Sequence, residues 1–227
     1  MGCVMPRIEQ LSTSIINKIA AGEVIERPAS AVKELIENAV DAGATRVDVT
    51  IEEGGSRLIR VVDDGHGIAA DQMELAIASH ATSKIRSADD LFCVRTLGFR
   101  GEALASISEV SQMTLRSRTA DEEVGNIFEI SGGQRSNLRP TGCPTGTLVE
   151  VRNLFFNTPV RRKYLKTVQI EMGHITEAIT RIALVYCDVH FSIKHNGRII
   201  HDLPAVDNWE DRIAHFFGRD LAQGLIW

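Results

Sequence analysis

The sequence has 227 residues, of which 44% are hydrophobic and 24% are charged, a composition typical of a soluble globular protein with a buried core. Its formal net charge of −5 argues against a surface devoted wholly to nucleic acid but leaves room for local basic patches. The sequence has no run near the roughly 18 apolar residues of a membrane span, and its four cysteines lie far apart without a C-x-x-C pair. These features argue against a membrane protein, a disulfide framework and a zinc site, and they predict a cytoplasmic protein.

The first part of the chain predicts a flexible start and two helices. Residues 1–8 show no pattern of a regular element, and residues 15–20 carry a short helical period that Gly22 is expected to end. In the second helix, Pro28 suits the first turn and Gly43 suits the left-handed position just past the end. The apolar residues between them have the spacing of one helix face that packs on a core: Val32, Leu35, Ile36, Ala39 and Val40.

The polar residues of this second helix form another stripe, roughly opposite the apolar one: Glu34, Glu37, Asn38 and Asp41. Surface helices usually look this way, so the stripe by itself is typical of a solvated acidic face. The alternative interpretation is that Glu34 and Asn38, which are one turn apart, point together at a bound metal–phosphate group. The helix alone does not decide between the two interpretations.

The middle of the chain predicts an antiparallel hairpin and then a long segment with little regular pattern. The apolar period is two in residues 45–51 and again in 58–62, and residues 54–56 form the turn. The stretch 79–100 is long for a connection, which is typical of a functional lid or a disordered segment. The other elements expected here are a loop at 63–67, a helix at 71–78, a turn of helix at 87–91 and a helix at 102–108.

The last part of the chain predicts more strands and two helices. The strands are expected at 113–117, 127–130, 147–151, 189–194 and 198–201, with turns at 132–133 and 140–146. Asn196-Gly197 is a strong signal for a type I′ hairpin turn. A loop is expected at 154–159, a basic patch at 161–163, helices at 170–187 and 209–217, and the start of a strand at 224–227.

This order of elements lacks the regular β-α-β alternation of a doubly wound fold. It predicts an α+β protein, a two-layer sandwich in which a mixed, mostly antiparallel sheet is covered by helices on one face. The sequence contains no G-x-x-x-x-G-K-[ST], which argues against a P-loop NTPase. Gly65-His-Gly-Ile-Ala-Ala70 matches the loose dinucleotide fingerprint, but the strand before it belongs to a hairpin, so we reject a Rossmann site.

Four stretches together carry more information than any one motif. They are Glu34 with Asn38, Asp63-x-Gly65-x-Gly67, Gly98-Phe-Arg-Gly101 and Gly146-Thr147. In this order the sequence resembles the GHKL ATPases (gyrase B, heat-shock chaperone, histidine kinase, MutL), whose two-layer sandwich is the Bergerat type. Longer stretches at 17–30, 80–84, 97–107 and 156–163 resemble the signatures of the MutL/HexB branch, which acts in DNA mismatch repair.

The resemblance implies an ATP site that uses Mg²⁺. Glu34 would be the catalytic residue, a general base for the attacking water, and Asn38 would give a side-chain oxygen to the metal. Asp63 would accept the amino group of adenine, whereas its ordinary interpretation is a carboxylate in a strand-end turn. Glu37 and Asp41 keep the interpretation of solvated surface residues.

The glycines of these motifs would let the backbone approach the nucleotide, and the helix that opens after Gly98 would direct its amides at the phosphates. A hinge, a solvated lysine and an ordinary strand threonine are the alternatives for Gly98–Gly101, Lys84 and Thr147. The full set of nucleotide-binding residues implied by the resemblance is Asn38, Asp63, Gly65, Gly67, Thr82, Ser83, Lys84, Gly98, Phe99, Arg100, Gly101, Glu102, Ala103, Leu104 and Thr147.

A basic cluster made of Arg161, Arg162, Lys163 and Lys166 is either a solvated face or a contact with the DNA backbone. As further partners the resemblance implies the mismatch-recognition protein MutS and a second copy of the chain, paired through the N-terminal region when ATP binds. It implies no membrane partner. The expected location is the cytoplasm, at the nucleoid, or the nucleus in a eukaryote.

The resemblance also implies a domain plan. Residues 9–205 would form the ATPase domain, and residues 206–227 would begin a transducer domain that is incomplete here. In the family that domain delivers a lysine to the γ-phosphate. Two functions therefore stay open: a slow, Mg-dependent ATPase that acts as a conformational and dimerisation switch in mismatch repair, or a fragment that binds ATP and DNA without hydrolysis. A third alternative is another GHKL branch.

Overall fold

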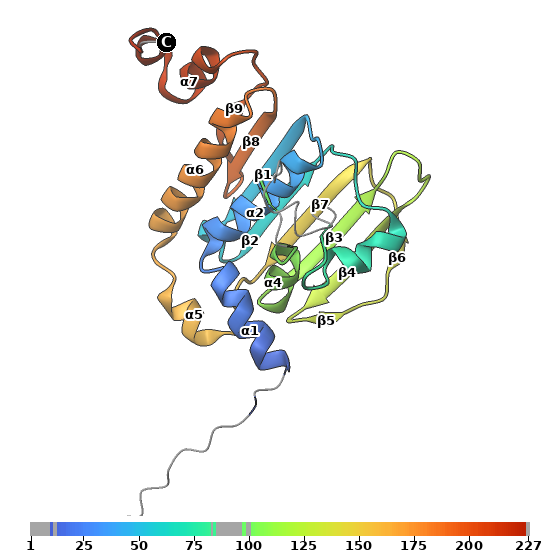
Figure 1. Cartoon of the computed structure of the whole chain (residues 1–227). Helices are drawn as coiled ribbons and strands as arrows, with labels where there is room; N and C mark the ends of the chain where they lie inside the picture. Colours follow the sequence, from blue (N-terminus) through green and yellow to red (C-terminus); the bar gives the residue numbers. More distant parts are fainter. Residues whose placement is uncertain (1–9, 11–12, 83, 85–96, 99–100, 226–227) are drawn as a thin grey trace, which may run out of the picture.

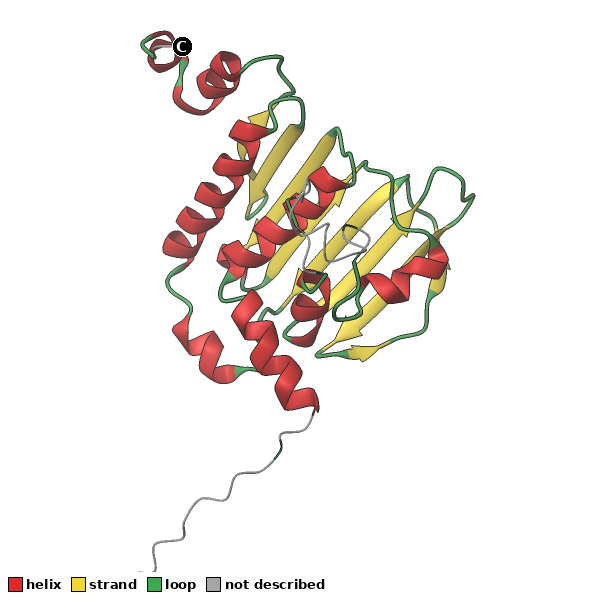
Figure 2. Ribbon diagram, viewed as in Figure 1, coloured by secondary structure: helices red, strands yellow, loops and turns green. Residues whose placement is uncertain are grey.

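In the computed structural model, the described residues are 10, 13–82, 84, 97–98 and 101–225. Their strands form one mixed sheet in the order β5-β4-β3-β7-β2-β1-β8-β9, with β6 paired to β4. Within this part of the chain β1 and β8 pair in parallel, and all other strand pairs are antiparallel. Helices lie in front of one face of the sheet (Figures 1 and 2). The predicted α+β fold class is therefore confirmed.

The strands are β1 (Arg46–Glu52), β2 (Leu58–Asp63), β3 (Gln112–Arg118), β4 (Gly125–Ser131), β5 (Gln134–Arg135), β6 (Arg139–Thr141), β7 (Gly146–Arg152), β8 (His190–His195) and β9 (Arg198–Leu203). The α-helices are α1 (Thr13–Val24), α2 (Pro28–Asp41), α3 (Met73–Ala76), α4 (Ala103–Glu109), α5 (Pro159–Tyr164), α6 (Val168–Val185), α7 (Trp209–Phe217) and α8 (Arg219–Gln223), with 3₁₀ turns η1 (Glu53–Gly55) and η2 (Ala70–Gln72).

Helix α2 lies over the middle of the sheet, and its sequence explains its bounds. Pro28 occupies the first turn, and Gly43 has a φ of +70° just past the end, as the two residues predict. The expected apolar stripe faces the core: Val32 and Ile36 are fully buried, while Val40 is partly buried and packs against it. This stripe joins the inner face of β1 and β2 in one hydrophobic cluster that also includes α6.

The type I′ turn between β8 and β9 is confirmed, since Asn196 and Gly197 have φ values of +48° and +79°. Several other expectations were wrong. Gly22 does not end α1, which continues to Val24. The loop expected at 154–159 ends one residue early, because Pro159 begins α5, the helix that carries the basic run at 161–163. The expected turn at 140–146 begins inside a short strand, since Pro140 lies opposite Asn126 at the edge of the sheet, where a residue without an N–H is tolerated.

Residues 224–225 follow a helix, α8, rather than starting a strand. Where a helix at 71–78 was expected, the chain forms η2 and the short α3. The flexible start at 1–8 and the turn of helix at 87–91 lie outside the described residues.

Helix α7 is tied to the end of the sheet by one buried side chain. Arg212 is 0% exposed and donates hydrogen bonds to the carbonyl oxygens of Cys187, Val189 and Leu203 at 2.7, 2.7 and 3.1 Å. Its guanidinium also lies 5.9 Å from the centre of the Phe191 ring. This anchor joins α7 to β8, β9 and the residues after α6, while the domain boundary at 205/206 stays a prediction.

Candidate functional site

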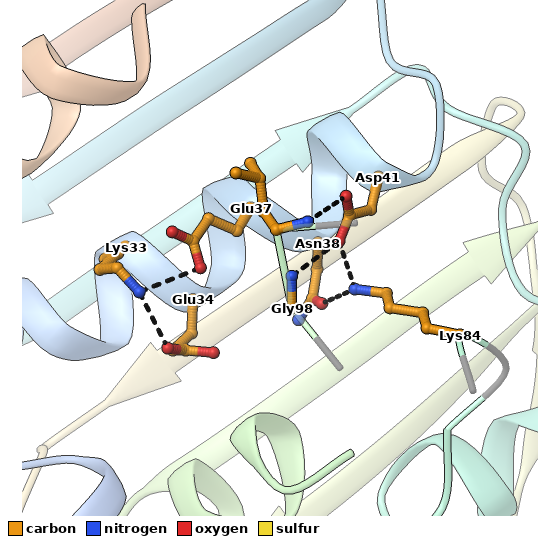
Figure 3. A network of polar contacts seen from close by, with 8 residues as sticks. Lys33, Glu34, Glu37, Asn38, Asp41, Lys84 and Gly98 are labelled. Carbon is orange, nitrogen blue, oxygen red and sulfur yellow. Dashed lines mark hydrogen bonds and ion pairs between the residues drawn. The ribbon is translucent and has the colours of Figure 1, made fainter. Parts of the chain in front are cut away.

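Glu34 and Asn38 lie one turn apart on α2, and their side chains are partly exposed (Figure 3). The Glu34 side chain is 28% exposed, and Oε1 lies 3.3 Å from Nζ of Lys33. Oδ1 of Asn38 accepts a hydrogen bond from Nζ of Lys84 at 3.0 Å. The helix therefore gives a carboxylate and an amide oxygen that a ligand beside this face can reach.

Glu37 and Asp41 are not solvated, and this part of the sequence interpretation was wrong. Glu37 is 7% exposed and pairs with Lys33 at 3.1 Å. Burial raises the pKa of Glu37, while the hydrogen bond from Lys33 acts in the opposite direction. The Asp41 side chain is 8% exposed, because Lys84 and the backbone at 97–98 pack on it. A helical period cannot reveal this cover, since the covering residues lie more than 40 positions away.

Asp63 stands at the end of β2, where its carboxylate is mostly enclosed. Its Oδ1 accepts hydrogen bonds from the backbone N–H groups of Gly65 and Thr147 at 3.0 and 3.2 Å. Burial raises the pKa of Asp63 to about 6, although both amide hydrogen bonds favour the ionised form. Among the described residues, both hydrogen bonds to this carboxylate are made to Oδ1 and none to Oδ2.

A line of polar side chains runs from Asp63 across three strands. Asp63 on β2 lies opposite Thr147 on β7, which lies opposite Ser117 on β3. The Ser117 and Thr147 hydroxyl oxygens are 3.0 Å apart, and the Ser117 hydroxyl donates to the Gly146 carbonyl and accepts from the Ile68 N–H. Sequence reasoning missed Ser117, although a serine at an inward position after Met113 and Leu115 is a usable signal.

The glycines of this region allow close packing of backbones. Gly146 has a φ of +115°, and a Cβ there would lie 2.1 Å from the carbonyl oxygen of Asp63. Gly67 has a φ of +75°, and its Cβ would lie 2.2 Å from the carbonyl oxygen of Arg118. These glycines hold the loop at 63–67 against β7 and the end of β3, which fixes the Asp63 carboxylate.

The loop at 63–67 meets the end of α2, so Asp63 lies in the same region as Glu34 and Asn38. The His66 N–H donates to the Ala42 carbonyl at 3.0 Å, and a Cβ on Gly65 would lie 2.8 Å from that oxygen. Ala42 follows Asn38 by one turn. Glu34 and Asn38 therefore follow one another along α2, and the loop that carries Asp63 lies at the end of this helix.

The residues expected around the phosphates come from two segments that meet each other. His80 pairs with Glu102 at 2.9 Å, and Gly101, with a φ of +62°, lies against the Ala81 carbonyl. The Thr82 hydroxyl accepts from the Lys84 N–H, and Glu102 precedes Ala103 and Leu104 at the start of α4. Gly98 lies next to Lys84 and Asp41. Ser83, Phe99 and Arg100 lie outside the described residues.

The basic cluster is divided in two. Arg162, Lys163 and Lys166 are exposed, as either interpretation of the cluster requires. Arg161 is only partly exposed: its guanidinium occupies the space that a side chain at Gly22 would fill, and it donates to the Ile25 carbonyl at 3.4 Å. Arg161 therefore joins α5 to α1, and only the other three cations offer their charge to a partner.

The donor atoms fit one kind of metal site. Among the described residues no three His, Cys, Asp or Glu side chains are grouped to hold a metal ion. Mg²⁺ does not need such a cage, because it accepts one or two protein oxygens together with phosphates and water. The Asn38 amide oxygen, one turn from Glu34, fits this requirement.

Comparison with known proteins shows which family this chain belongs to. Residues 25–141 match the family described as histidine kinase-, DNA gyrase B-, and HSP90-like ATPase. The chain is 47% identical over 222 residues to the DNA mismatch repair protein MutL of Desulforamulus reducens, which covers 98% of this chain and 35% of that protein. It is 54% identical over 220 residues to MutL of Xanthomonas oryzae pv. oryzae, and this match covers 96% of this chain and 35% of that protein. The chain thus spans about a third of the length of these relatives.

Solved structures show the same fold. The Aquifex aeolicus MutL ATPase domain complexed with ADP is 39% identical, with a TM-score of 0.72, and the match covers 86% of this chain and 70% of that one. The N-terminal domain of a DNA repair protein is 27% identical, with a TM-score of 0.76, covering 89% and 60%. Within the described residues no helix is long and apolar enough to cross a membrane.

Proposed function

The chain belongs to the histidine kinase-, DNA gyrase B- and HSP90-like ATPase family, and on this premise we propose that it binds and slowly hydrolyses ATP as the N-terminal module of a MutL-type mismatch repair protein. One observation carries the proposal: the mostly buried carboxylate of Asp63 lies at the loop that meets α2, the helix that presents Glu34 and Asn38. The ADP bound to the similar Aquifex aeolicus domain supports an adenine nucleotide as the ligand.

Asp63 selects adenine in this proposal. Its Oδ2 accepts the exocyclic amino group, while Oδ1 stays on the Gly65 and Thr147 amides. Guanine presents a carbonyl oxygen at the corresponding position, which a carboxylate repels. Thr147 and the buried Ser117 hold the strand ends around this carboxylate. The ionised form is the one that accepts, so adenine binding weakens as the pH falls through the Asp63 pKa of about 6.

Glu34 is the general base in this proposal. Its partly exposed carboxylate can take a proton from a water aligned with the γ-phosphate. Asn38 would hold Mg²⁺, which supplies neutralisation of phosphate charge when it is bound. Lys84 would bind the phosphates, because its ammonium lies beside Asn38, and Thr82 contacts the backbone of Lys84. Gly98, and the residues from Gly101 to the start of α4, would add backbone amides.

The role in repair rests on the resemblance to MutL. ATP binding would favour pairing of two N-terminal regions and would link mismatch recognition by MutS to later steps. Arg162, Lys163 and Lys166 are exposed and would contact the DNA backbone without reading sequence.

The test compares the release of phosphate by the wild-type chain, Glu34→Ala and a control, Glu23→Ala, which changes an exposed carboxylate on α1. We expect Glu34→Ala to reduce release to background, while it still binds a fluorescent ATP analogue and Glu23→Ala behaves as wild type. Analogue binding with no wild-type release above Glu34→Ala would favour a non-hydrolysing binding module. Absence of binding by the wild type would refute the proposed function.

A further inference from the structure

Asp41 is a buried acidic residue for which the proposed function has no role. Three donors meet at its carboxylate. Nζ of Lys84 and the Gly98 N–H contact Oδ2 at 2.5 and 3.2 Å (Figure 3), and the Leu97 N–H donates to Oδ1 at 3.0 Å. Its side chain is 8% exposed and that of Lys84 is 19% exposed. Such a carboxylate fixes its partners strongly, because hydrogen bonds to a charged acceptor are shorter and stronger than neutral ones.

Asp41 also determines where the Lys84 ammonium lies. The same Nζ that contacts Asp41 donates to Oδ1 of Asn38 at 3.0 Å. Asn38 and Asp41 are three positions apart on α2 and so lie on one face of the helix. The long lysine side chain is therefore held at its tip by two acceptors from one rigid element, beside the oxygen that we assign to the metal.

Gly98 completes this arrangement. A Cβ at position 98 would lie 3.2 Å from Nζ of Lys84, which is tighter than ordinary contact between such atoms. The glycine thus leaves room for the ammonium while its N–H bonds to Asp41. Lys84 and the backbone at 97–98 thus bind the same carboxylate.

We propose that Asp41 is a positioning residue for the triphosphate end of the site: it holds the Lys84 ammonium and the Gly98 backbone beside Asn38 and neutralises that ammonium until phosphate binds. This inference rests on the proposed function, since it assumes that phosphates lie near Asn38. In this role Asp41 is more than a structural ion-pair partner, because its charge affects the affinity for triphosphate through Lys84.

The charges make a distinctive prediction for paired variants. Removal of the Lys84 charge alone leaves a buried carboxylate facing the phosphates, where it repels them. Asp41→Asn removes that repulsion and keeps one oxygen for a backbone amide. We therefore expect Asp41→Asn to improve triphosphate binding in a Lys84→Gln background, although the Asp41 carboxylate organises the site in the wild type.

The experiment measures the affinity of the wild-type chain, Asp41→Asn, Lys84→Gln and the double variant for a fluorescent, non-hydrolysable ATP analogue and for adenosine. Lys84→Gln should weaken binding of the ATP analogue roughly tenfold, about the value of one hydrogen bond to a charged group. Binding of adenosine, which has no phosphates, should change little. Adding Asp41→Asn should recover at least about twofold in affinity for the ATP analogue, the low end of coupling between contacting residues.

Glu37→Gln is the matched control, since Glu37 is also buried on α2 and paired with a lysine; it should show no coupling to Lys84→Gln. Urea unfolding of each variant separates loss of fold from loss of affinity. If Asp41→Asn has the same effect in both backgrounds, or couples to Lys84→Gln in stability but not in triphosphate affinity, the inference is wrong. If the wild type binds neither ligand, the proposed function fails first.

Discussion

Replacing Asp63 by asparagine should stabilise the protein and weaken nucleotide binding at the same time. The pKa of Asp63 is raised from 3.8 to about 6 by burial, so its ionised form is disfavoured in the folded chain. An increase of this size means that ionising Asp63 costs about 3 kcal/mol more in the folded chain than in the unfolded chain. Asparagine keeps an oxygen for the Gly65 and Thr147 amides but carries no charge.

The pH dependence gives this prediction its sign. A carboxyl group whose pKa is higher in the folded state binds protons more readily there, so it adds stability below pH 3.8 and loses this contribution as the pH rises through about 6. Asp63→Asn should therefore unfold with a free energy about 3 kcal/mol above wild type at pH 8, and with about half that advantage at pH 5.

Urea unfolding followed by circular dichroism at the two pH values measures this difference. Asp71→Asn, which changes an exposed carboxylate near the same loop, serves as the control and should leave the difference near zero. An advantage that is equal at pH 5 and pH 8, or a loss of stability at pH 8, would refute the reasoning. At pH 8, where Asp63 is ionised, Asp63→Asn should bind adenine nucleotide at least tenfold more weakly than wild type, roughly one hydrogen bond to a charged group, and this difference should shrink at pH 5.

Two further predictions concern other parts of the chain. Arg212→Met should lower the free energy of unfolding by about 3 kcal/mol, because three buried carbonyl oxygens lose their donor. Urea unfolding measures this change, with the exposed Arg219→Met as the control. Equal changes in the two variants would contradict the prediction. Arg162→Glu combined with Lys163→Glu should weaken duplex DNA retention and reduce its dependence on salt, whereas unchanged retention across a salt series would remove these residues from the DNA contact.

Local patterns in the sequence were sufficient for much of the fold. The bounds of α2, its apolar stripe and the turn at Asn196-Gly197 depend on residues within a few positions of one another, and those preferences act in any context. The pairing of β1 with β2 follows from the short turn between them. The candidate site needed more, because Glu34 and Asn38 resemble any solvated acidic stripe until the later glycine motifs are considered with them.

Only the tertiary structure decided which polar residues are covered. Asp41 and Glu37 carry the same helical signal as exposed acids, and Asp41 is buried because Lys84 and the backbone at 97–98, more than 40 residues later, pack on it. Arg161 looked like its exposed neighbours, yet its guanidinium fills the space above Gly22.

The same limit explains the parallel pairing of β1 with β8, whose residues are 144 positions apart at Arg46 and His190. A side chain's environment is set by whichever segment the chain folds against it, and a helical or strand period contains no information about that segment. The sequence of this protein therefore determined its elements and the chemistry available on α2. The tertiary structure determined which of those groups are buried, paired and held in position.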